Sequence, residues 1–257
     1  MYQTMKKTGN VIIGFTVLIV IWQSVIMLTD INENLFPTPL MVLEGLISLI
    51  ADGTLWTHIR VSLIRFAIGY SLATVSAIVL GLILGRLERL WEIANPIVQV
   101  LRPVAPIAWS PFIVLWFGIG DIPAIVIIFI AAFFPVLLST VSAVRKVERT
   151  YLKVAENFEM NPFQVMTKII LPAAFPLIAN GMHIALGTAW IFLVSGEMVG
   201  AQSGLGYLIV DARNLLRLDL VLAGIVCIGV LGLILDKAIT AFERWLQKQW
   251  GGAAPSK

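Results

Sequence analysis

The sequence has little of what metal sites, disulfides and soluble surfaces are built from. Only 13% of its 257 residues are charged, about half the share found in ordinary soluble domains. A single cysteine, Cys227, excludes an internal disulfide, and its place in an apolar run indicates helix packing. The two histidines, His58 and His183, lie far apart without other residues at metal-ligand spacing. We therefore expect no metal site.

A phosphate-cradling loop is also missing. The pattern G-x-x-x-x-G-K-[ST] occurs nowhere in the chain, and that loop holds the phosphates in P-loop nucleotide-binding proteins. The chain should therefore bind no ATP by itself. We expect no catalytic residues and no cofactor bound by this chain.

Apolar residues dominate what is present. They make up 59% of the chain, and the mean hydropathy is +0.93. Several apolar runs reach about 18 residues or more, which is enough for a helix to cross a hydrocarbon layer of ~30 Å. The sequence therefore predicts a polytopic membrane protein.

We expect an all-α fold with about six membrane spans. The predicted spans cover residues 11–28, 66–85, 96–117, 122–144, 173–199 and 220–235. The first is expected to be retained, because no small-x-small cleavage pattern follows it. The third is interrupted by Pro103, Pro106 and Pro111, and an amphipathic segment around 41–50 is expected along the membrane surface. The whole chain, 1–257, then forms one transmembrane domain, with a core at 60–242 and a tail at 243–257.

The basic residues predict the orientation of these spans. Four of the 18 lysines and arginines fall in the segments on one side of the membrane: Arg60, Arg65, Arg213 and Arg217. The remaining 14 fall on the other side or, for Arg102, inside the third span. Because cytoplasmic segments carry the excess of lysine and arginine, both termini and the segment 145–168 are predicted to be cytoplasmic.

The charged segment 145–168 is expected to fold as two short amphipathic helices. Thr150 can cap the first, and Asn161 followed by Pro162 is typical of a helix start. Pro172 disfavours a simple continuation of the second helix into the fifth span, as does Pro176. The two apolar stripes are Tyr151, Val154 and Phe158, then Phe163, Met166 and Ile170.

Such stripes, held just below a membrane, need a covering surface. A DNA-binding helix-turn-helix is excluded, because acidic residues nearly match basic ones and leave no phosphate-binding face. Two readings remain open at this point. The segment is either an interfacial loop against its own spans or a docking element for a cytoplasmic protein.

Residues 153–172 resemble the EAA signature of ABC importer permeases, E-A-A-x3-G-x9-I-x-L-P, and keep its spacing without a gap. Two positions depart from it: Lys153 stands at the Glu of the motif and Glu159 at its Gly. That Gly usually serves the turn between two helices, where a positive φ costs little without a Cβ. The matching residues are Val154, Ala155, Ile169, Leu171 and Pro172.

Other short motifs, in order along the chain, resemble the permeases of the nitrate/sulfonate/taurine branch of ABC importers. The similarity runs from about residue 36 to residue 245. The motifs are L-R-P-x-x-P-x-x-W-x-P at 101–111, L-W-F-G-I-G at 115–120, F-F-P at 133–135, A-L-G-x-A-W at 185–190, E-M at 197–198 and G-L-G at 204–206 with A-R at 212–213.

The resemblance implies a type I importer permease with MetI-like architecture in the cell inner membrane. It implies a homodimer, two copies of a cytoplasmic ATPase that uses ATP and Mg²⁺, and an extracytoplasmic solute-binding protein; no nucleic acid is involved. Segment 150–172 is then the element that couples to the ATPase. Its predicted coupling residues are Lys153, Val154, Ala155, Phe158, Glu159, Asn161, Phe163, Met166, Ile169, Leu171 and Pro172.

Polar groups at membrane depth are candidates for the translocation pathway, because they are costly there and usually face a cavity or a partner. Arg102 and Glu197 are the clearest, although a structural pairing explains each equally well. The other candidate lining residues are Trp109, Ser110, Ser195 and Met198.

A second class of function stays open. An ion-coupled secondary transporter would need no ATPase, but such folds often show internal repeats, and none is visible here. The substrate is not determined by the sequence. The branch carries small oxyanions, sulfonates, taurine and other small organic solutes, and Arg213 and Arg217 on the predicted outer side could favour an anion or dock the binding protein.

Overall fold

The computed structural model describes residues 2–29 and 36–249, and every regular element within those ranges is a helix. The all-α prediction is therefore confirmed. In order, the longer elements are α1 (Tyr2–Thr29), α2 (Pro39–Ala51), α3 (Thr54–Arg86), α4 (Glu88–Leu101), α6 (Asp121–Arg145), α9 (Leu171–Gly200), α10 (Leu205–Asn214) and α11 (Leu218–Gln249). The short ones are the 3₁₀ turn η1 (Pro106–Trp109), α5 (Ser110–Phe117), α7 (Arg149–Asn157), α8 (Pro162–Val165) and the π turn η2 (Met166–Ile170).

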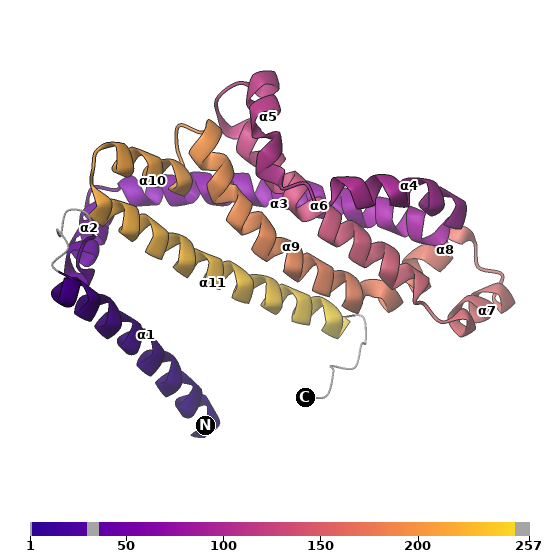
Figure 1. The fold of residues 1–257 in the computed structure, drawn as a ribbon. Coiled ribbons are helices and arrows are strands. Elements are labelled where there is room, and N and C mark those ends of the chain that lie inside the picture. The colour runs from indigo at the N-terminus through magenta and orange to yellow at the C-terminus, as the bar shows by residue number, and fades with distance from the viewer. Residues whose placement is uncertain (1, 30–35, 250–257) are drawn as a thin grey trace.

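Four long helices, α3, α6, α9 and α11, form the body of the molecule (Figure 1). α3 and α6 pack closely and run in the same direction. A Cβ placed on Gly81 would lie 2.6 Å from the Cβ of Thr140, and one on Gly85 would lie 2.7 Å from the Cβ of Val144. These two glycines let the backbones approach, as small residues do between membrane helices.

α9 returns antiparallel to α6, and α11 runs back along α9. The Ser139 hydroxyl donates to the Leu177 carbonyl at 2.7 Å, which joins α6 to α9. The Trp190 indole N–H donates to the Ile228 carbonyl at 3.1 Å, which joins α9 to α11. Both donors, the Ser139 hydroxyl and the Trp190 indole N–H, are thus paired with backbone carbonyls, as an apolar medium requires.

The predicted spans each correspond to a helical segment. Four helices are long and apolar enough to cross a membrane: Thr54–Arg86, Asp121–Arg145, Pro162–Gly200 and Leu218–Ala241. α4 and the η1–α5 pair pass the same test together, but they are bent by 85° at the break between them. α1 covers the predicted first span, and its apolar part runs from Thr16 to Leu28.

Three helices extend beyond the predicted ranges. The helix of the second predicted span, α3, begins at Thr54, whereas the span was predicted from residue 66. The helix of the third begins at Glu88, and α4 continues through Pro96 before the chain breaks at the prolines that follow. The predicted tail begins as part of α11, which ends at Gln249; residues 250–257 lie outside the described ranges.

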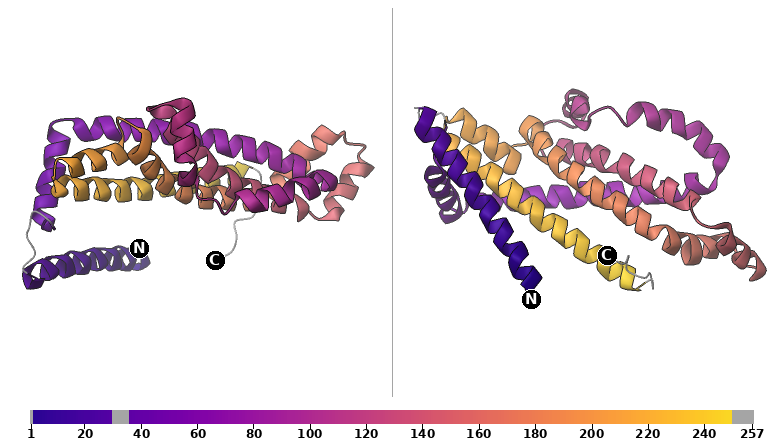
Figure 2. Two further views of the ribbon diagram at one scale, coloured as in Figure 1. Left: turned by 45° about the horizontal axis from the view of Figure 1, so that its top comes forward. Right: turned by 60° about the horizontal axis from the view of Figure 1, so that its bottom comes forward.

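The two ends of the body carry different elements. α2 and α10 lie at one end, and α7 and α8 lie at the other, beside the junction of α3 and α4 (Figure 1). The further views keep α7 and α8 at that end and show α5 projecting from the side of the body (Figure 2). Any coupling between the two ends must therefore pass along the long helices.

Candidate functional site

The segment from Arg149 to Ile170, called the charged element below, begins with α7. That helix ends in a Schellman motif: the Glu159 N–H donates to the Glu156 carbonyl at 3.0 Å, and the Met160 N–H donates to the Ala155 carbonyl at 3.1 Å. The motif requires a left-handed residue, and Glu159 supplies it at φ 49°. Glu159 thus has the conformation for which the EAA signature uses glycine.

The second helix of the charged element starts as predicted. Asn161 accepts a hydrogen bond from the Gln164 N–H at 2.8 Å, and the Gln164 side chain accepts one from the Asn161 N–H at 3.2 Å. This reciprocal capping box, with Pro162 in the first turn, satisfies backbone donors that a helix start leaves free. The predicted cap at Asn161 is confirmed.

The second helix continues into the fifth span, although Pro172 and Pro176 disfavour a simple continuation. The helical segment Pro162–Gly200 is continuous, because the π turn η2 connects α8 to α9. In an α-helix the ring of Pro172 would clash with the carbonyl four residues earlier. The wider π turn, in which the Leu171 N–H donates to the Met166 carbonyl five residues back, lets the helix continue into Pro172.

The apolar residues of the charged element divide between the interior and the surface. Ala155, Val165 and Ile170 are buried, and Met166 and Ile169 are half-buried against the core. Phe158 and Phe163 are instead 77% and 76% exposed. Among the described side chains, the exposed members of the two predicted stripes are therefore Tyr151, Phe158 and Phe163.

The other predicted coupling residues are placed around that surface. Lys153 and Glu159 are exposed, as is Asn161, and Leu171 and Pro172 are half-buried at the start of α9. Val154 lies in α7, but its side chain is outside the described part of the structure. The structure thus brings most of the predicted coupling residues to one end of the molecule.

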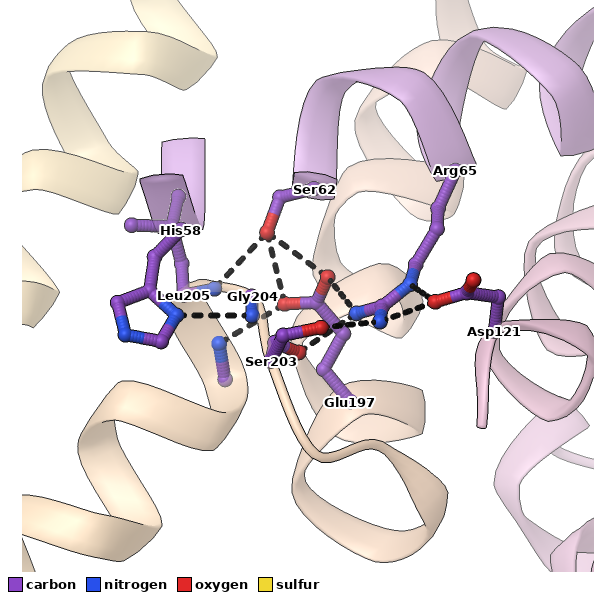
Figure 3. Close-up of polar contacts among 9 residues, drawn as sticks. His58, Ser62, Arg65, Asp121, Glu197, Ser203, Gly204 and Leu205 are labelled. Carbon is purple, nitrogen blue, oxygen red and sulfur yellow. Dashed lines mark hydrogen bonds and ion pairs between the residues drawn. The ribbon is translucent and has the colours of Figure 1, made fainter. Parts of the chain in front are cut away.

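A second group of polar residues lies at the opposite end, where α3, α6 and α9 meet the loop before α10 (Figure 3). Its centre is Glu197, whose side chain is buried and accepts bonds from the Ser62 hydroxyl at 2.8 Å and from Arg65 Nη1 at 2.9 Å. A buried carboxylate is stable only when its lone pairs are satisfied in this way. This group, called the polar cluster, comprises His58, Ser62, Arg65, Asp121, Glu197 and Ser203.

Arg65 connects the members of the polar cluster. The side chain is 2% exposed, and Nε donates to Asp121 Oδ1 at 2.8 Å. Nη1 donates to the Ser203 carbonyl at 2.6 Å, and Nη2 donates to the Ser203 hydroxyl at 2.8 Å. One guanidinium therefore joins three helices and a loop, and it forms ion pairs with two carboxylates.

The polar cluster also caps α10, which has no capping side chain of its own. Three successive backbone N–H groups find acceptors on other helices: Gly204 donates to His58 Nδ1 at 3.0 Å, Leu205 to Ser62 Oγ at 2.8 Å, and Gly206 to Glu197 Oε2 at 2.9 Å. A negative charge at a helix N-terminus is further stabilised by the helix dipole. α10 is thereby attached to α3 and α9.

Two glycines make that attachment possible. A Cβ on Gly204, whose φ is +103°, would lie 2.2 Å from Glu197 Oε1, and one on Gly206 would lie 2.4 Å from the Val194 carbonyl. These distances exclude any side chain at either position. They are the physical reason for the G-L-G motif noted in the sequence.

The predicted pathway residues come from three parts of the fold. Glu197 belongs to the polar cluster, whereas Arg102 is exposed at the break between α4 and η1 and is not buried as its position in a span suggested. Trp109 and Ser110 lie at the junction of η1 and α5, and Ser195 and Met198 lie on α9. Their role in lining a pathway stays a prediction.

Sequence reasoning missed most of the polar cluster, namely His58, Ser62, Arg65, Asp121 and Ser203. A signal was present, because positions 58, 62 and 65 follow one helix face at i, i+4 and i+7. No group of histidine, cysteine and acidic residues in the described part of the chain could hold a metal ion.

The sequence of this chain is similar to those of known transport proteins. Residues 77–248 match the family described as binding-protein-dependent transport system inner membrane component. The chain is 36% identical to a protein of Bacillus subtilis named as an aliphatic sulfonates transport permease, covering 90% of this chain and 84% of that one. It is 35% identical to the taurine transport system permease protein of Escherichia coli, covering 92% and 87%, and 32% identical to a nitrate import permease protein of Synechocystis, covering 90% and 86%.

The fold has a counterpart among solved structures. A chain of the MetNI methionine ABC transporter, crystallised in inward-facing conformations, superposes with a TM-score of 0.60 at 21% identity. The match covers 74% of this chain and 93% of that chain. This likeness shows a shared MetI-like fold.

Proposed function

Since this chain belongs to the family of binding-protein-dependent transport system inner membrane components, we propose how its parts divide the work of import. It is a multi-pass permease of the nitrate, sulfonate and taurine type of ABC importer. It is a transport subunit and not an enzyme. It works with a separate ATPase and with a binding protein.

The charged element is the docking site for the ATPase in this proposal. The observation that carries it is a pair of mostly exposed phenylalanines, Phe158 in the turn after α7 and Phe163 in α8. Apolar rings in such a position need a partner surface. The Schellman turn and the capping box hold the two helices in a defined shape, and the ATPase would recognise that shape.

The connection of α8 to α9 supplies the route for movement. ATP binding would close the ATPase pair and displace Phe163, and the continuous segment Pro162–Gly200 would carry that displacement to Glu197. Because Glu197 caps α10, the far end of the molecule would respond. Alternating access is then a population shift between two arrangements, driven by contacts that differ between them.

The orientation and assembly follow from the same proposal. The charged element and both termini lie in the cytoplasm, as the distribution of lysine and arginine indicates. Two copies of the chain form the pathway, each bound to one copy of an ATPase that holds ATP and Mg²⁺. The binding protein delivers solute at the end that carries α10.

The substrate class is a small anion. The relatives named above are named for aliphatic sulfonates, taurine and nitrate. Arg213 is exposed near the end of α10, and Arg217 follows it with an ion pair to Asp219 at 2.7 Å. These cations would favour an approaching sulfonate or oxyanion, while selection among such anions belongs mainly to the binding protein.

Reconstitution into vesicles tests the proposed function. Uptake of a radiolabelled sulfonate should require the permease, its ATPase, the binding protein and ATP together, and the permease alone should hydrolyse no ATP. The competing class of function predicts the opposite pattern. Uptake that follows a proton or sodium gradient without the ATPase would identify a secondary transporter and refute the proposal.

A further inference from the structure

A charged pocket of about 350 Å³ lies at the end of the molecule that carries the charged element. Its walls come from four segments: the end of α3, the start of α4, the end of α6 with the residues after it, and the π turn η2. The lining residues that matter here are Gly85, Arg86, Glu88, Arg145, Val147 and Ile170. Nothing in the transport proposal uses this pocket.

Positive charge converges on the pocket from three directions. Arg86 is the last residue of α3, and Arg145 is the last residue of α6. α4 begins at the pocket with Glu88, and its N-terminus has no capping side chain, so backbone N–H groups of its first turn are available there. Glu88 supplies the one carboxylate among the lining residues, against the two arginine side chains.

The two arginines have no ion-pair partner in the described part of the chain. No ion pair joins Arg86 or Arg145 to a carboxylate among those residues. The Arg145 guanidinium lies 5.7 Å from the ring centre of Trp91, which orients it without balancing its charge. A basic residue at a helix C-terminus is favourable by itself, but that effect does not explain why two of them meet across a cavity.

The position of the pocket indicates what fills it. It lies where the apolar spans α3 and α6 end, which is the depth of lipid headgroups, and tryptophans such as Trp91 concentrate at that depth. α4 leads away from the pocket and exposes Ile93, Ile97 and Val100 at i, i+4 and i+7. A headgroup in the pocket would therefore have an apolar helix surface beside it for an acyl chain.

We propose that this pocket binds the phosphate group of an anionic phospholipid. Arginine guanidinium groups form paired, charge-assisted hydrogen bonds with phosphate oxygens, and basic pockets between membrane helices recognise such headgroups. The bound lipid would contact Val147, just before the charged element, and Ile170, at its end. The proposal rests on the proposed function only in naming this leaflet the cytoplasmic one.

The test compares three double variants of the purified permease, without ATPase or nucleotide. Arg86→Gln with Arg145→Gln removes two charges from the pocket, and Arg89→Gln with Lys146→Gln removes two exposed charges beside it. Thermal unfolding in mixed micelles and native mass spectrometry measure the preference for phosphatidylglycerol over phosphatidylcholine. We expect the pocket variant to bind phosphatidylglycerol at least about tenfold more weakly than wild type, with the control variant unchanged. Arg86→Lys with Arg145→Lys, which keeps the charge, should fold normally and retain most of the preference.

Three results would overturn the proposal. An equal loss in both Gln double variants would mean that general surface charge attracts the lipid. Stabilisation of the wild type by millimolar inorganic phosphate alone would assign the pocket to a free anion. An unchanged preference for phosphatidylglycerol in the Arg86→Gln, Arg145→Gln variant would mean that the pocket does not hold the headgroup. Because the lipid measurement needs no transport, its failure is distinguishable from failure of the proposed function.

Discussion

At the scale of single residues, Glu159 shows how a departure from a motif can keep the motif's geometry. The Schellman turn requires φ > 0, and Glu159 adopts 49° although its Cβ is unfavourable in that region. The backbone hydrogen bonds of the turn and the buried Ala155 hold it there. The turn is therefore formed at a local energetic cost that glycine would avoid.

Glu159→Gly should consequently stabilise the turn. Relief of the left-handed strain is worth about 1 kcal/mol, which corresponds to roughly fivefold slower opening of the local structure. Hydrogen exchange at the amides of Glu159 and Met160 measures that opening directly. Glu156→Gly serves as the matched control, because it removes a neighbouring carboxylate inside α7 and should speed exchange. Faster exchange in Glu159→Gly would mean that the glutamate side chain stabilises the turn in another way.

The polar cluster shows which residues a sequence reveals and which it conceals. Glu197 could be singled out, because a lone carboxylate in an apolar run must find a partner. Arg65 was not singled out, since an arginine near the start of a span reads equally well as a loop residue unless its helix face with positions 58 and 62 is considered. Only the fold shows that the guanidinium turns inward to Glu197, Asp121 and Ser203.

At the scale of elements, the charged element was predictable in its parts but not in its connection. Asn161 and Pro162 indicate a helix start because their chemistry is local. The continuation through Pro172 is not indicated, since proline ordinarily ends or kinks a helix and a π turn leaves no simple pattern in the sequence. The bent α4–α5 pair shows the converse, because the prolines near residue 103 did indicate the break.

The exposed phenylalanines of the charged element give the sharpest prediction at this scale. Phe158→Asp or Phe163→Asp would bury a charge in the proposed ATPase contact, at a cost of about 1–3 kcal/mol or more. Co-purification of the ATPase should therefore fall by roughly tenfold or more, while the membrane yield of the permease stays normal. Leu87→Asp is the matched control, because Leu87 is an exposed apolar residue at the same end but outside the element. Normal ATPase recovery with both phenylalanine variants would leave the segment as an interfacial loop.

At the scale of the whole molecule, the apolar runs predicted the order of the long helices. Among the described residues four helices, or five with the bent α4–α5 pair, are long and apolar enough to cross a membrane, whereas six spans were predicted. A segment that crosses about 30 Å of hydrocarbon must satisfy its backbone hydrogen bonds internally, and a helix does this. The runs did not predict that α3 and α6 are parallel neighbours with α9 returning beside them. That arrangement depends on close contacts at residues such as Gly81 and Gly85, whose partners lie far away in the sequence.

Orientation is the property of the whole molecule that remains to be measured. In a Cys227→Ser background, Asn214→Cys should react with an impermeant maleimide added outside the cell, and Glu156→Cys should react only after the membrane is opened. Both positions are exposed, so access alone decides the result. Asn32, also predicted to be outside, lies beyond the described residues. The reverse labelling pattern would place the charged element outside and invert the whole scheme.

The unbroken helical segment from Pro162 to Gly200 has a consequence for how this chain can vary in length. It contains 39 residues, and each residue added to or removed from an α-helix rotates everything beyond it by about 100°. Phe163 near one end and Glu197 near the other must both keep their facing directions. A one-residue insertion within α9 would therefore turn Glu197 away from Arg65 or turn Phe163 away from its partner surface. Changes of length should be tolerated instead in short links farther from this segment, between α6 and α7 and between α10 and α11.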